Sequence, residues 1–183
     1  PILKRNASSI ELSNKHDLLP RRTILRLMLP KLGVAYLFVM LLSVFNRVMI
    51  NELRIPATIV GLLYLGYNVM NVFQVLNGRL ADRRAFFGLR RTPLMFAGLM
   101  LSALSLLPFS FAAYEFSGGN AAALALMFLC MAGFGFGFAM NGDSQNTLIA
   151  ELTEGKRNRP GVVAAVWLFQ MVCIVASGIW LIP

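Results

Sequence analysis

The chain has 183 residues, of which 57% are hydrophobic and only 14% are charged. Soluble globular proteins carry about 25% charged residues, so this composition excludes an ordinary soluble domain. The formal charge of +9 could suggest a nucleic-acid-binding protein, but the basic residues flank long apolar runs instead of forming a basic soluble domain. We therefore predict an all-α membrane protein that does not bind nucleic acid.

The N-terminal region, residues 1–31, reads as a basic tail on the cytoplasmic side. Residues 1–17 are mostly polar, and residues 18–31 combine bases with Leu, Ile and Met. Arg22 and Arg26 share one helical face, which favours a short interfacial helix on anionic lipid. A plain basic flank explains the same residues equally well.

Five apolar segments follow, which we expect to form a transmembrane bundle over residues 32–183. Each is long enough to cross a hydrocarbon core of about 30 Å as a helix. Backbone groups in lipid must bond internally, and no series of alternating strands is present. The segments cover residues 32–50, 57–77, 93–114, 121–140 and 161–182. The fourth is expected to continue towards Glu151. An odd number of crossings fits either a fragment of a longer protein or the ordered part of one.

The distribution of basic residues predicts the orientation. Fifteen of the seventeen Lys and Arg residues lie in the N-terminal region, in the link after the second segment, or in the link after the fourth. The other side has only Arg47 and Arg54. Because cytoplasmic loops are enriched in Lys and Arg, the N-terminus should be cytoplasmic. We expect a multi-pass membrane protein with this orientation; the resemblance described below implies that the membrane is a bacterial inner membrane, either the cytoplasmic or the photosynthetic intracytoplasmic membrane.

A polar stripe runs along the second segment. Its members recur at intervals of three and four residues, which places them on one side of a helix. They are Tyr64, Tyr67, Asn68, Asn71 and Gln74. Lipid-facing residues should be apolar, so the stripe should face other helices or a cavity. It serves either interhelical hydrogen bonding or contact with a ligand or pigment.

The end of the first segment carries Asn46 and Arg47, followed by Glu52 in the link. An arginine at this depth is costly unless it is paired or reaches the interface. Two interpretations stay open: Arg47 extends to the outer interface, or it makes a functional contact or a fixed charge pair, for which Glu52 is near enough.

The fourth segment contains alternating glycine and phenylalanine over residues 133–138. Glycines inside a helix allow close approach of a neighbouring helix. We favour packing as their use, with a surface that seats a flat ring as the alternative.

Residues typical of catalysis or metal binding are not grouped in the sequence. His16, the single histidine, lies in the polar tail, and Cys130 and Cys173 lie inside apolar segments. No catalytic triad, phosphate-binding loop or metal-ligand cluster can be assembled from these positions. The sequence therefore predicts neither an enzyme nor a metal site.

The link between the second and third segments, GRLADRRAFFGLRR, resembles the cytoplasmic signature of the major facilitator superfamily. That signature also joins helices two and three on the cytoplasmic side. Its positions are matched here by Gly78, Asp82, Arg83, Gly88, Arg90 and Arg91. The interval from Asp82 to Gly88 is longer than in the usual transporter pattern. The resemblance implies a major-facilitator-like bundle, of which five helices are visible.

Within that superfamily the chain is similar to the bacteriochlorophyll-delivery branch, the PucC/LhaA-like light-harvesting complex assembly proteins. The similarity is carried by Asn46–Leu53 with Pro56, by Gly88–Pro93, and by Lys156–Trp167. It implies a twelve-helix protein that helps to build antenna complexes.

The same resemblance implies the partners and the cofactor. These are antenna polypeptides or a reaction-centre/antenna complex, together with membrane lipid. The implied cofactor is bacteriochlorophyll, held transiently or bound, and a carotenoid is compatible with it. Because the single histidine, His16, lies in the polar tail and not in a membrane segment, Asn, Gln, a backbone carbonyl or water would have to hold the magnesium. Two alternatives remain: a structural subunit of a photosynthetic pigment–protein complex, and a small-solute transporter.

Overall fold

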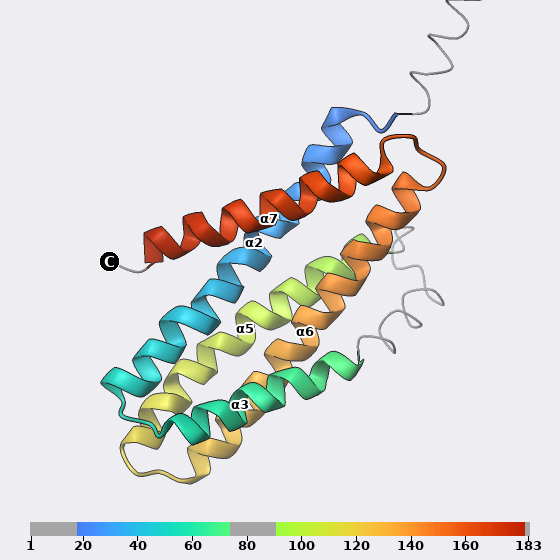
Figure 1. The fold of residues 1–183 in the computed structure, drawn as a ribbon. Coiled ribbons are helices and arrows are strands. Elements are labelled where there is room, and N and C mark those ends of the chain that lie inside the picture. The colour runs from blue at the N-terminus through green and yellow to red at the C-terminus, as the bar shows by residue number, and fades with distance from the viewer. Residues whose placement is uncertain (1–17, 74–90, 182–183) are drawn as a thin grey trace, which may run out of the picture.

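A computed structural model describes residues 18–73 and 91–181 of the chain. Within these ranges the protein is a bundle of five α-helices with no β-strand, in which the long helices run side by side (Figure 1). The helices are α2 (Arg21–Val39), α3 (Ala57–Met70), α5 (Thr92–Ser117), α6 (Ala122–Thr153) and α7 (Arg159–Leu181). The prediction of an all-helical protein is confirmed for this part of the chain.

The first span is one continuous helical rod. Helix α2 leads into two π-helical segments, Met40–Phe45 and Val48–Glu52, and the whole run from Arg21 to Glu52 has 32 residues. The expected division between a tail and a bundle at residue 32 therefore does not coincide with a break, because residues 21–31 are already helical. Pro30 lies inside α2 and removes one backbone donor.

Four helical runs are long and apolar enough to cross a membrane: Arg21–Glu52, α5, α6 and α7. Helix α3 is shorter, because its 14 residues span about 21 Å, and the 3₁₀ turn Asn71–Phe73 follows it. The second predicted segment continues to residue 77, but residues 74–77 lie outside the described part. The structure thus supports a multi-pass membrane protein, with four long candidate spans among the described residues.

Glycines bring α6 into close contact with two neighbours. A Cβ built on Gly137 would lie 2.6 Å from the carbonyl oxygen of Gly98 in α5, and one on Gly98 would lie 2.6 Å from that of Gly137. A Cβ on Gly135 would lie 2.6 Å from the Tyr67 carbonyl in α3. Such contacts are shorter than any side chain tolerates, so the alternating glycines are used for helix packing.

The main core lies where the π-helical end of the first span meets α3, α5 and α6. Its fully buried side chains include Leu41, Leu63, Phe109 and Phe134. A smaller apolar cluster joins α2, α6 and α7 through Leu19, Leu27, Ile149, Val162 and Val166. Many leucine and phenylalanine side chains outside these cores are exposed. This pattern is expected where lipid covers the bundle.

Candidate functional site

The polar stripe predicted on the second segment lies on α3. The Tyr64 hydroxyl donates a 2.7 Å hydrogen bond to the Leu41 carbonyl in the π-helical segment, so this residue links two helices. Asn68 is exposed, and its amide donates to the Tyr64 carbonyl within the same helix at 2.8 Å. The side chain of Asn71 and all of Gln74 lie outside the described part. The stripe therefore divides between a contact inside the bundle and an exposed surface.

An aromatic series connects three helices beside this stripe. The ring of Tyr67 lies 5.8 Å from that of Phe134 and 6.1 Å from that of Phe138, measured between ring centroids. Phe138 also stacks on Phe38 of α2 at 6.1 Å. Aromatic pairs at these distances add about 1 kcal/mol each beyond area burial. The series packs α2, α3 and α6 together.

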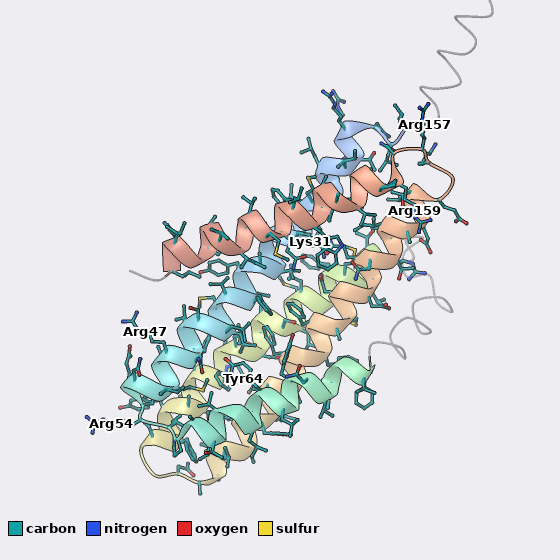
Figure 2. The ribbon with its side chains drawn as sticks, in the orientation of Figure 1. Lys31, Arg47, Arg54, Tyr64, Arg157 and Arg159 are labelled. Carbon is teal, nitrogen blue, oxygen red and sulfur yellow. The ribbon has the colours of Figure 1, made fainter. Side chains whose placement is uncertain are left out.

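The end of the first span shows no fixed charge pair. Asn46 is half-buried, whereas Arg47 and Glu52 are exposed, and among the described residues Arg47 and Glu52 form no ion pair. Figure 2 shows Arg47 and Arg54 at the opposite end of the bundle from Arg157 and Arg159. This placement fits the interpretation in which Arg47 reaches the interface.

Only the last residue of the signature-like loop can be placed. Gly78, Asp82, Arg83, Gly88 and Arg90 lie outside the described part of the chain. Arg91 is 7% exposed, and both its Nε and its Nη2 lie 2.9 Å from Glu151 Oε1 of α6. A charge-assisted bond of this kind fixes the start of α5 against the end of α6.

Three polar side chains on α2 and α6 are buried, and we call them the buried polar residues: Lys31, Asn141 and Gln145. Gln145 Nε2 donates to the Leu27 carbonyl of α2 at 3.0 Å, and Asn141 Nδ2 donates to the Met95 carbonyl of α5 at 2.8 Å. Lys31 is 3% exposed, and its Nζ lies 4.6 Å from the centre of the Trp167 ring. Figure 2 labels Lys31, which lies close to α7.

The sequence interpretation did not select these three residues. Lys31 was assigned to the basic tail, and Asn141 and Gln145 follow the predicted end of the fourth segment at residue 140. The spacing of Asn141 and Gln145 could have indicated a shared role, because the two residues lie one turn apart on the same face of α6. Asp143 lies within α6, which continues to Thr153 in line with the expected extension towards Glu151, and one of its carboxylate oxygens is shielded from solvent.

An apolar cavity of about 350 Å³ lies against Asn141. It is bounded by α2, α5 and α6, and its wall is made by Leu29, Pro30, Gly33, Thr92, Met95, Phe96, Leu99 and Asn141. The Oδ1 atom of Asn141 has no hydrogen-bond partner in the described structure. A mostly apolar pocket with a few polar groups, here Thr92 and Asn141, is typical of sites that bind small apolar ligands.

Comparison with known proteins gives one family. The sequence model described as PUCC protein matches residues 44–181. Protein PucC of Rhodovulum sulfidophilum is 28% identical over 174 residues, which are 89% of this chain and 38% of that protein. Protein PucC of Cereibacter sphaeroides is 27% identical over 179 residues, which are 91% of this chain and 38% of that protein.

A third relative is named the bacteriochlorophyll synthase 44.5 kDa chain, from Rhodobacter capsulatus. It is 28% identical over 157 residues, which are 84% of this chain and 35% of that protein. The chain thus spans less than two fifths of the length of these curated relatives. No solved structure matches it.

Proposed function

The chain belongs to the PUCC protein family, and we propose that it helps to assemble light-harvesting complexes by handling or delivering bacteriochlorophyll. The observation that carries the proposal is the family match over residues 44–181, which extends from the π-helical segment to the end of α7. The name of the bacteriochlorophyll synthase 44.5 kDa chain supports the choice of pigment. Because the chain spans only part of its relatives, the activity is proposed for the full-length gene product.

The pocket between α2, α5 and α6 is where we propose that part of a pigment lies, because its volume of about 350 Å³ is smaller than a whole bacteriochlorophyll. Its wall is apolar apart from Thr92 and Asn141. The Oδ1 of Asn141 is an oxygen donor of the kind that magnesium accepts, but it is shielded from solvent, so the side chain would have to turn towards the pocket to reach a ligand. We propose that Asn141 would orient the pigment by its metal, while Pro30, Gly33 and Leu99 exclude water around it.

The finer architecture is also a proposal. We propose that the five helices are the first five of a major-facilitator-like half, with the N-terminus on the cytoplasmic side of a bacterial inner membrane. The described basic residues support this orientation, since Arg157 and Arg159 lie at one end of the bundle (Figure 2). The signature-like loop between α3 and α5 supports the superfamily.

Purification of the tagged full-length protein from its native photosynthetic membrane tests the function. We expect near-infrared absorption from bacteriochlorophyll and antenna polypeptides among the copurifying proteins. We also expect that deletion of the gene lowers antenna absorption. A preparation with neither pigment nor antenna partners, together with normal antenna in the deletion strain, would contradict the proposal.

Two substitutions test whether pigment binding depends on the pocket or on another part of the surface. Asn141→Leu should lower the pigment content of the purified protein, whereas the matched control Asn68→Leu, at an exposed amide of α3, should leave it unchanged. Thermal unfolding of both variants shows whether a loss of pigment follows from a loss of fold. Equal pigment in the two variants would exclude Asn141 as the orienting residue.

The same preparations distinguish the two alternatives. A structural subunit would be present in the mature antenna complex at fixed stoichiometry, whereas an assembly factor is confined to immature complexes. A small-solute transporter would move its solute into vesicles without any dependence on pigment.

A further inference from the structure

A groove lies between α6 and α7 near the loop that joins them. Figure 1 shows that the two helices diverge from each other as they leave this loop. The groove has a volume of about 210 Å³, and its wall is made by Asn146, Ile149, Ala150, Arg159, Val163 and Trp167. We call it the α6–α7 groove. It shares no lining residue with the pigment pocket proposed above.

The groove is amphipathic along its length. Arg159, Val163 and Trp167 follow each other at intervals of four residues on one face of α7, and the outer two are about 12 Å apart along the helix axis. Arg159 lies at the loop end, and the apolar side chains of Ile149 and Val163 lie farther along. Neither Arg159 nor Asn146 forms a hydrogen bond or an ion pair with another side chain that the structure describes.

Positive charge surrounds the loop end of the groove. The Leu19 amide donates to Asn158 Oδ1 at 3.1 Å, which holds the start of α2 against the α6–α7 loop. This contact gathers the basic residues of both segments: Arg21, Arg22, Arg26, Lys156, Arg157 and Arg159. The same region contains two acidic residues, Glu151, which is bonded to Arg91, and Glu154, which lies in the loop. The basic residues therefore outnumber the acidic ones at this end.

A buried lysine lies next to the groove. Trp167 lines the groove, and the ammonium group of Lys31 lies over its ring, 4.6 Å from the ring centroid. Among the described residues, no carboxylate forms an ion pair with Lys31. The positive potential of the region is therefore not confined to exposed side chains.

We propose that the α6–α7 groove is a binding site for an anionic phospholipid. The phosphate would lie at Arg159, the polar backbone of the lipid near Asn146, and one acyl chain along Val163 and Trp167. Basic pockets between membrane helices are suited to such headgroups. The proposal depends on the charge and shape of this groove and not on whether the protein handles pigment.

Trp167 is a natural reporter for this site. The full-length protein is placed in nanodiscs of phosphatidylcholine and titrated with brominated phosphatidylglycerol or brominated phosphatidylcholine, which quench nearby tryptophan. Subtracting the signal of a Trp167→Phe variant isolates the response of Trp167. We expect quenching at a lower mole fraction of the anionic lipid than of the zwitterionic lipid.

Substitutions at the loop end test the site itself. Arg159→Gln should reduce the preference for the anionic lipid roughly fivefold, the effect of one basic residue near a membrane surface, while Arg159→Lys should keep it. Arg22→Gln removes an exposed charge from the same end without touching the groove, so it should have a smaller effect. The retained preference of the lysine variant shows that the fold is intact.

Three outcomes would overturn the proposal. Equal quenching by the two lipids would show that the groove does not select charge. Equal losses in Arg159→Gln and Arg22→Gln would assign the preference to the general surface potential. Displacement of the brominated lipid by bacteriochlorophyll, without any preference for the anionic lipid, would assign the groove to pigment.

Discussion

Lys31 is a buried cation whose removal should not weaken the fold. Burying an ammonium group costs several kcal/mol, whereas its contact with Trp167 contributes about 2 kcal/mol. Desolvation therefore outweighs the attraction, and Lys31→Met should raise the free energy of unfolding by about 1 kcal/mol. Thermal unfolding in detergent measures the change, with Arg26→Met as the control at an exposed base of the same helix. A clear fall in stability would show that the charge itself supports the fold.

Arg91 and Glu151 form an ion pair in which one partner is buried and the other is partly exposed. The Glu151 side chain is 44% exposed, so solvent screens the interaction, but the Arg91 guanidinium is shielded. Glu151→Gln should lower the free energy of unfolding by about 1 kcal/mol, because it weakens a charge-assisted hydrogen bond. Glu154→Gln, at an exposed carboxylate one turn away, should have no measurable effect. Equal unfolding temperatures for the two variants would contradict this role of the pair.

At the scale of the element, the contact between α5 and α6 depends on glycine. A methyl group on Gly137 would lie 2.6 Å from the Gly98 carbonyl, which is backbone and cannot move aside. Gly137→Ala should therefore destabilise the protein by about 1–3 kcal/mol. Gly142→Ala in the same helix meets open space, so it should stabilise α6 by up to about 1 kcal/mol. Opposite shifts of the unfolding temperature are expected, and a loss of the same size in both variants would contradict the packing argument.

Hydropathy predicts the helices well because crossing lipid requires a long apolar run. The boundaries are less predictable, as the first span shows. Because Lys31 is charged, the sequence predicts that the basic tail ends there. In the structure Lys31 is instead part of a helix, and Trp167, which is distant in sequence, covers its ammonium group. The π-helical widening near Leu41, which Tyr64 stabilises through its hydroxyl, has no signal in hydrophobic periodicity either. In the candidate site, Asn141 and Gln145 donate hydrogen bonds to carbonyl groups of α5 and α2. These carbonyl groups are distant in sequence, so only the packed structure shows the bonds.

For the whole molecule, the remaining question is which end of the bundle faces the cytoplasm. The α6–α7 loop contains Lys156 and Arg157, whereas the loop between α5 and α6 contains no base. Because basic loops are retained on the cytoplasmic side, the two loops should lie on opposite sides of the membrane. A cysteine that replaces Glu154 shows on which side the α6–α7 loop lies, and a cysteine that replaces Ser117 does the same for the loop between α5 and α6. Both positions are exposed.

Labelling of the full-length protein in intact spheroplasts with a membrane-impermeant maleimide decides the orientation. Ser117→Cys should react directly, and Glu154→Cys should react only after the membrane is permeabilised. The native Cys130 and Cys173 are buried, so they should contribute little background. The parent protein supplies that background as the control. Direct labelling of Glu154→Cys together with protection of Ser117→Cys would reverse the orientation and place the basic end, with the α6–α7 groove, outside the cytoplasm.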